Sequence, residues 1–106
     1  MEYEVVVSAK ARELLLSHAK FLAQVSIKAG MELFDQFEKL IFSLREMPER
    51  CPPYSATSML PTKYRHALLQ KHYLIIFQIV GNIVHIELIL DGRAENTKHI
   101  LELNGR

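Results

Sequence analysis

Two arginines, Arg65 and Arg93, are the residues of this sequence whose type and position could best serve chemistry. Arg93 lies in "LDGRAE", between Asp91 and Glu95, directly after a strand-like apolar segment. Charge-assisted hydrogen bonds that these two carboxylates accept would orient its guanidinium group, which could then engage a phosphate or a carboxylate. The simpler interpretation is that both arginines form surface ion pairs with Glu87, Asp91 or Glu95, which contribute little to stability.

The histidines and the cysteine give no second candidate centre. The five histidines are scattered, and no pair has the spacing of zinc ligands with a third ligand in support, so we expect neither a metal nor another cofactor. His72 and His85 are expected to be half-exposed strand residues. Cys51 is the single cysteine, which excludes an internal disulfide and fits a reducing compartment.

The composition fits one globular domain spanning residues 1–106. Thirteen basic and twelve acidic residues leave a net charge of +1. This balance argues against a protein that binds many phosphate groups at once, because each phosphate contact needs its own cation. No apolar run approaches the ~20 residues that span a membrane, and the start "MEYEVVV" is acidic where a signal peptide is basic. We therefore expect a cytoplasmic protein without a membrane partner.

The first half of the chain predicts a strand followed by two helices. In "EYEVVV", Tyr3, Val5 and Val7 share one face, as in a short strand at the edge of a sheet. Ser8 and Ser26 stand where helix N-caps belong. Behind them, apolar residues recur at helical spacing: Ala11, Leu14, Leu15, Ala19, Leu22 and Val25 in the first helix, and Ala29, Leu33, Phe34, Phe37, Leu40, Ile41 and Leu44 in the second.

The second half predicts a loop and an antiparallel meander. Pro48 is expected to end the second helix, because the residue before a proline is pushed out of the helical region. Residues 48–62 hold all four prolines and no periodicity, which predicts a long connecting loop. "KYRHALLQ", "HYLIIFQIV" and "IVHIELIL" then predict three strands, with Gly81-Asn82 as a two-residue turn between the last two.

That turn fixes a register in which the residues sort onto two faces. One face, wholly apolar or aromatic, pairs Ile79–Val84, Phe77–Ile86, Ile75–Leu88 and Tyr73–Leu90. It is expected to be the core beneath the helix pair. The second face pairs Val80–Ile83, Gln78–His85, Ile76–Glu87 and Leu74–Ile89. Because it is half apolar, it needs cover from a C-terminal helix, a homodimer mate or a protein partner.

The order strand, helical hairpin, proline-rich loop and meander resembles the RelE/ParE superfamily of bacterial toxins, also described as plasmid stabilisation proteins. The resemblance is carried by "SAKARELL", "LREMP", "YR" at Tyr64-Arg65, and "HYLIIFQIVGNIVHIELILDGRAE", which together extend over nearly the whole chain. It implies an α+β fold in which an N-terminal strand and a helical hairpin pack on an antiparallel meander sheet. It also implies a toxin of a type II toxin–antitoxin module, neutralised by a small antitoxin and reaching operator DNA only through that antitoxin.

The superfamily divides by target: RelE-like toxins cut mRNA on the ribosome, whereas ParE-like toxins poison DNA gyrase. In the cleaving pattern, cations lie along the first meander strand and after the tyrosine of the second, and a tyrosine or histidine follows a late arginine. Arg65 and Arg93 match, but Ala67 and Leu74 stand at two of the cationic positions. The resemblance therefore favours the ParE-like branch. The alternatives are a toxin-fold binding module without toxicity, and a RelE-like ribonuclease that uses the two arginines with His72, His85 or His99.

The register and the resemblance together predict where a site and a partner surface lie. Arg93 is expected at the rim of the second face, close to where Arg65 projects. His99 joins these two catalytic candidates only if the protein is a ribonuclease, because no tyrosine follows Arg93. The antitoxin is expected to cover the second face through Leu74, Ile76, Ile89, His85 and Glu87.

Overall fold

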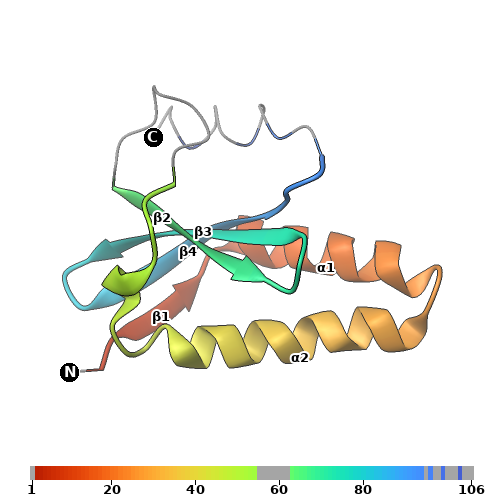
Figure 1. Ribbon diagram of the computed structural model, residues 1–106, viewed down its shortest axis with the longest axis horizontal. Coiled ribbons are helices and arrows are strands. Elements are labelled where there is room, and N and C mark those ends of the chain that lie inside the picture. The colour runs from red at the N-terminus through yellow and green to blue at the C-terminus, as the bar shows by residue number, and fades with distance from the viewer. Residues whose placement is uncertain (1, 55–62, 95, 97–98, 100–102, 104–106) are drawn as a thin grey trace.

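The computed structural model describes residues 2–54, 63–94, 96, 99 and 103. In chain order its elements are β1 (Glu4–Val7), α1 (Ala9–Ala23), α2 (Ile27–Ser43), the short 3-10 helix η1 (Pro48–Arg50), β2 (Tyr64–Leu69), β3 (Tyr73–Val80) and β4 (Ile83–Asp91). The two long helices form a hairpin on one side of the sheet (Figure 1). None of the helices described is long and apolar enough to cross a membrane.

The strands form one sheet in the order β1-β4-β3-β2. The β2, β3 and β4 strands make the predicted antiparallel meander, and β1 lies at the edge, as expected. The structure adds that β1 runs parallel to β4, so that the sheet is mixed. A parallel pair needs a long crossover connection, and here the α1–α2 hairpin and the meander lie between the two strands. The α+β arrangement predicted from the sequence is confirmed.

Both helices begin at the predicted serine caps. The hydroxyl of Ser8 accepts the N–H of Ala11 at 3.0 Å, and the hydroxyl of Ser26 accepts the N–H of Ala29 at 3.2 Å. The second helix ends at Ser43, before the predicted stop at Pro48, and the chain then turns through a left-handed Met47 with a φ of 51°. Two residues assigned to the apolar stripes are exposed instead: Phe34 at 40% and Val25 at 91%.

The helix-side face of the sheet forms the main core. It contains Tyr73, Ile75 and Phe77 of β3, packed with buried residues of both helices. The β4 strand contributes Val84, Ile86 and Ile89 to this core, and α1 and α2 contribute Ala11, Leu15, Ala19, Leu33 and Phe37. The predicted inner face of β1 packs against the same core, through Tyr3, Val5 and Val7.

The predicted register of β3 and β4 is correct near the turn and wrong beyond it. From Val80↔Ile83 to Phe77↔Ile86 the pairs are as expected. A β-bulge then puts Glu87 into β4 as an extra residue, so that Leu88 rather than Glu87 lies opposite Ile76. The predicted pairing would have placed an acid at the centre of a buried face, and the bulge places a leucine there. As a result, Ile89 turns to the helix side, and the second face receives Leu88 and Leu90.

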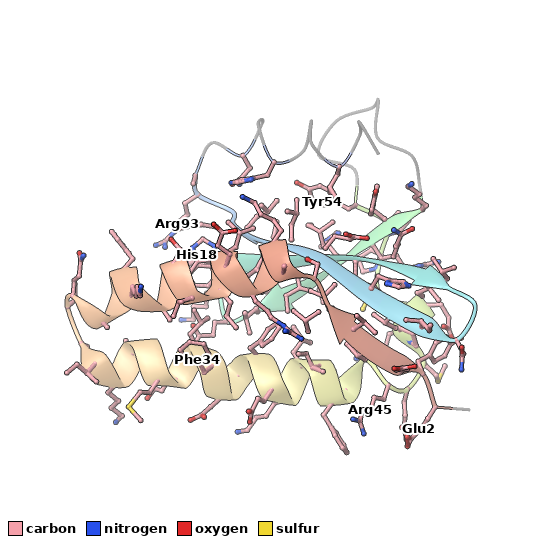
Figure 2. The ribbon with its side chains drawn as sticks, turned by 180° about the vertical axis from the view of Figure 1, so that it is seen from behind. Glu2, His18, Phe34, Arg45, Tyr54 and Arg93 are labelled. Carbon is pink, nitrogen blue, oxygen red and sulfur yellow. The ribbon has the colours of Figure 1, made fainter. Side chains whose placement is uncertain are left out.

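The second face is covered at its centre by residues of this same chain. Ile76, Leu88 and Leu90 are buried in a cluster with Tyr64 of β2 and with Tyr54 and Leu103. Tyr54 lies on the side of the sheet away from the helices (Figure 2). The expectation that this face needs cover is confirmed, and the chain itself supplies part of that cover.

Candidate functional site

The best-defined cluster of charged side chains lies where β4 ends. After Asp91, Gly92 donates its N–H to the carbonyl of His72 at 2.7 Å, which turns the chain away from the sheet. Both carboxylate oxygens of Asp91 accept from Arg93: Nε donates to Oδ1 and Nη2 to Oδ2, each at 3.1 Å. Oδ1 also accepts the backbone N–H of Arg93 at 2.9 Å. The contact is bidentate, the geometry that fixes the plane of a guanidinium group.

This pairing favours the ionised form of both groups. The hydrogen bond with Arg93 lowers the pKa of Asp91 from its ordinary value of 3.8, although partial burial opposes the shift. The same hydrogen bond raises the pKa of Arg93. The side chain of Arg93 remains 55% exposed, and a guanidinium group has five N–H donors. Among the described residues, the donors that do not reach Asp91 have no other partner, so they can meet an external anion or carboxylate.

Two side chains from other elements complete this β4 corner, which consists of His18, Tyr73, Asp91 and Arg93. His18 Nε2 lies 2.8 Å from the carbonyl oxygen of Ile89, and Nε2 is the donor because a carbonyl only accepts. The imidazole ring also lies 4.9 Å from the ring of the buried Tyr73. Burial raises the pKa of Tyr73, and the charge of Asp91 adds to this shift while Arg93 opposes it. Figure 2 shows His18 and Arg93 near each other at this end of the sheet.

The sequence patterns do not identify His18 or Tyr73 as members of a site. For His18 a signal was present, because it lies midway between Leu14 and Leu22 at a spacing of four residues. Residues at this spacing share one side of a helix. Since Leu14 and Leu22 pack on the main core, the periodicity directs His18 toward the sheet as well. A polar side chain on this apolar side of the helix needs a hydrogen-bond partner on the sheet, and the carbonyl of Ile89 is that partner.

Arg65 lies on β2 and binds the backbone of the preceding loop. Its Nη1 donates to the carbonyl of Cys51 at 2.6 Å and to the carbonyl of Glu49 at 3.1 Å. Beside these contacts, Pro53 forms an isolated antiparallel bridge with Arg65. The guanidinium group therefore holds η1 and residues 51–54 against the edge of β2.

The structure does not bring the two arginines together, and the prediction that they share a rim is wrong. Arg65 lies opposite Phe77 of β3, whereas Asp91, next to the other arginine, lies opposite Tyr73. Four residues of extended strand separate these positions, about 13 Å at a rise of ~3.3 Å per residue. The reason is that β2 runs antiparallel to β3, so that β2 begins at the turn end of the hairpin. Arg65 also shares the helix-side face of β2 with Ala67 and Leu69.

The predicted partner surface is also rearranged. The placement of Ile89 on the second face is wrong, because the β-bulge turns this side chain into the helix-side core. Ile76 lies on the predicted face but is fully buried within the chain's own cluster. Leu74, His85 and Glu87 are half-buried, and Gln78 Nε2 donates to Glu87 Oε2 at 2.9 Å. Contact between an antitoxin and these three residues stays a prediction.

The remaining candidates do not form a second centre. His72 is exposed, and His99 is half-buried, with an Nδ1 that has no hydrogen-bond partner among the described residues. Glu95, the second acid beside Arg93, lies outside the described residues. Burial raises the pKa of the Cys51 thiol, which disfavours a nucleophilic thiolate. In the part of the chain that the structure describes, no group of three or more His, Cys, Asp or Glu could hold a metal ion.

Comparisons with known proteins bear on the fold. A scan against models of protein families finds no match, and a search of curated protein sequences finds none either. Among solved structures, a chain of the "Chromosomal ParDE TA system from P. aeruginosa" matches with a TM-score of 0.69 over 85% of this chain and 96% of that chain, at 12% sequence identity. The chain has the RelE/ParE fold. The fold implied by the sequence resemblance is thereby confirmed.

Proposed function

We propose that this chain is a ParE-like toxin of a type II toxin–antitoxin module, which inhibits DNA gyrase and is neutralised by a cognate antitoxin. The observation that carries the proposal is the structural match to nearly the whole length of a ParDE chain, with a TM-score of 0.69. The motifs quoted from the sequence support it independently, because they appear in the order of the superfamily and end in the "LDGRAE" segment.

The positions of the two arginines support an inhibitory binding role over RNA cleavage. Cleavage of a phosphodiester needs cations on the scissile phosphate and a group that moves the proton of the 2′-hydroxyl, all converging on one point. Arg65 instead donates to two backbone carbonyls, and Arg93 lies toward the other end of the β3–β4 ladder. A surface that only binds a target needs no such convergence.

The β4 corner is the part of the site that we assign to the target. Its Arg93 is exposed, and Asp91 holds it in a fixed plane. A guanidinium group fixed in this way has lost much of its conformational freedom before binding, so less entropy is lost when it meets a carboxylate or a phosphate.

A supercoiling assay tests this function. Purified chain is added to DNA gyrase, ATP and relaxed plasmid, and we expect supercoiling to fall with the amount added. The protein encoded by the reading frame that adjoins the gene of this chain should restore supercoiling when it is mixed in first. The same preparation after thermal unfolding serves as the control.

A translation assay is the counterpart of this experiment. Added to ribosomes and mRNA, the purified chain should leave the message intact. Undiminished supercoiling together with codon-specific cuts in ribosome-bound mRNA would contradict the gyrase assignment and favour the RelE-like alternative.

A further inference from the structure

The two edges of the sheet differ in how their backbone groups are paired. At the β2 edge, a preceding segment of the chain lies along the strand, and His66 donates its N–H to the carbonyl of Pro52 at 3.0 Å. In the same segment, Tyr54 donates its N–H to the carbonyl of Tyr64 at 2.8 Å. At the β1 edge, no part of the chain that the structure describes bonds in this way to the outer side of Glu4–Val7. The outer N–H and C=O groups of an open edge strand are a template for another strand.

The open backbone groups of β1 belong to Val5 and Val7. On the side of β4, Glu4 donates its N–H at 2.9 Å to the turn before that strand, and Ser8 donates to the carbonyl of Ile86 at 3.0 Å. Successive residues of a strand direct their backbone groups to opposite sides, so the groups of Val5 and Val7 point outward. Among the described residues, these groups have no backbone partner.

The β1 strand carries none of the features that usually protect an edge. Its interior, Val5-Val6-Val7, has no lysine and no proline. The side chain of Val6 is 40% exposed, whereas its two neighbours pack against the main core. The open stretch starts after Tyr3, which donates its N–H to the carbonyl of Arg45 at 2.8 Å, and it ends where α1 begins. An added strand therefore has about the length of β1 itself.

In one register, β1 is complementary to a second copy of itself. When two antiparallel copies pair about Val6, Val5 of each copy lies opposite Val7 of the other, and each of these pairs can exchange both N–H···O=C bonds. The two Val6 side chains then lie side by side and cover each other. Registers centred on Val5 or Val7 use fewer of the open groups, because Tyr3 is already bonded and Ala9 belongs to α1.

The charges at the two ends of β1 favour the same antiparallel register. Glu2 and Glu4 precede the valines and are exposed, and Lys10 follows them in the first turn of α1. Within the described part of the chain, none of the three forms an ion pair. Antiparallel pairing brings the acids of one copy beside the lysine of the other, whereas parallel pairing would bring the acids of both copies together.

We infer that the β1 edge binds a second copy of this chain, antiparallel about Val6, so that two four-stranded sheets join into one. Paired residues of neighbouring strands place their side chains on the same face of a sheet. Both helical hairpins therefore lie on the same side of the joined sheet. This dimer goes beyond the proposed function, and the supercoiling assay can fail without affecting it.

Sedimentation equilibrium of the full chain tests the dimer. The wild type should change from monomer to dimer as its concentration rises. Val6→Lys places a charge at the centre of the proposed contact, and Val80→Lys, at an exposed valine of β3 beside the turn, is the matched control. We expect the dissociation constant of the dimer to rise roughly tenfold or more for Val6→Lys, and less than about twofold for Val80→Lys. Melting curves verify that both variants are folded.

A disulfide across the twofold axis tests the register. The Cα atoms of residues paired as the two Val6 residues are lie ~4.5 Å apart, within the roughly 4.4–6.8 Å that a disulfide spans. With oxidised glutathione as the oxidant, Val6→Cys should form a covalent dimer, and the native Cys51 thiol is buried. Glu4→Cys is the control on the same strand, because in this register the two positions lie roughly 13 Å apart along the strands. We expect it to cross-link about tenfold more slowly or less.

The charges can be exchanged between the two ends of the strand. Lys10→Glu should weaken the dimer a few-fold, because it places acids beside acids, and the loss should shrink in high salt. Its fold is expected to be intact, since an acid in the first turn of a helix is favourable. The double variant Glu2→Lys/Lys10→Glu should restore dimerisation.

Four results would overturn the inference. One is a wild-type chain that stays monomeric at every concentration, and another is a dimer that Val6→Lys leaves intact. Equal rates of cross-linking for Val6→Cys and Glu4→Cys would exclude the register about Val6. If Val6→Lys instead lowers the affinity for the protein encoded by the adjoining reading frame, and the chain alone is a monomer, the edge takes its strand from that partner.

Discussion

Arg65 and Arg93 carry the same guanidinium group, but they belong to two regions of the sheet that bind it differently. Arg65 lies beside the turn half of the β3–β4 ladder and donates to backbone carbonyls at 2.6 and 3.1 Å. Arg93 lies beyond the far half, past the β-bulge, where it donates to a carboxylate and stays 55% exposed. The carbonyls are fixed acceptors at every pH, whereas the carboxylate can take up a proton.

This difference indicates which of the two arginines is free to bind an external group. Removing Arg65 leaves the carbonyls of Glu49 and Cys51 without their charged donor, so the fold depends on this residue. Removing Arg93 leaves an acid that water can reach and solvate. A side chain whose removal lowers the stability of the fold only slightly is available for a role in binding.

The largest effect is expected in the turn half, at the residue opposite Arg65. Phe77 is fully buried, and Phe77→Ala should lower the free energy of unfolding by about 3–5 kcal/mol, because it leaves a cavity in the main core. Denaturant titration at neutral pH measures this, with the exposed Phe42→Ala as the control. Near-native stability of Phe77→Ala would contradict the register of the turn half.

A smaller loss is expected from Arg65 itself. Arg65→Ala should cost roughly 1–3 kcal/mol, because two backbone carbonyls lose a charged donor. Arg65→Lys should retain part of this stability, since an ammonium group can reach one carbonyl but does not reproduce the planar fork. If an Arg65→Ala protein melts like the wild type but loses toxicity, Arg65 is a target-binding residue, and the distinction between the two arginines is wrong.

A still smaller effect, and one that depends on pH, is expected in the far half. Pairing with Arg93 lowers the pKa of Asp91 below its ordinary value of 3.8 in the folded state. The stabilisation by this carboxylate is therefore fully present above that value and is lost as the pH falls toward the folded-state pKa. Asp91→Asn should melt below the wild type at neutral pH, and the gap between the two curves should begin to narrow below about pH 4 and close once the pH is below the folded-state pKa. A gap that stays the same size as the pH falls through the acid range would show that the effect is not electrostatic.

The smallest change in stability is expected for Arg93→Ala, since Asp91 keeps its hydrogen bond with the backbone N–H at position 93. Its effect should fall on function, because the exposed donors are lost. We expect growth arrest on expression to weaken while the complex with the antitoxin still forms. If Arg93→Ala arrests growth as the wild type does but no longer binds the antitoxin, Arg93 is a partner contact and the assignment of the β4 corner is wrong.

The features that the sequence predicts well are those set by local interactions. The caps at Ser8 and Ser26 and the turn at Gly81 depend on a few neighbouring residues, and all three are found in the structure. The β-bulge at Glu87 depends on the residues of the neighbouring strand, because the apolar run Leu88–Leu90 is compatible with the register that has the bulge and with the one that lacks it. Because of this one inserted residue, the predicted face of Ile89 is wrong: the side chain lies on the helix side of the sheet.

The site was predictable in part for the same reason. The Asp91–Arg93 pair follows from residues two positions apart, and the expected orientation of the arginine by this acid is found. The partners from α1 and β3 depend on how the helix lies across the sheet. The spacing of residues within one segment does not predict the angle between the helix and the sheet. The separation of the two arginines, by contrast, follows from the antiparallel meander that the sequence predicts, so the expectation of a shared rim is inconsistent with that meander.

The parallel pairing of β1 with β4 has a consequence for synthesis of the chain on the ribosome. β1 pairs with Ile83–Ile86, and the hydroxyl of Ser8 donates to the carbonyl of Glu87 across 79 residues of sequence. A growing chain therefore presents β1 and both helices long before the strand that pairs with β1 has been made. Such distant contacts form late, because the intervening chain must first be ordered. We therefore expect the complete sheet, and with it the β4 corner, to form only after residue 91 has left the ribosome.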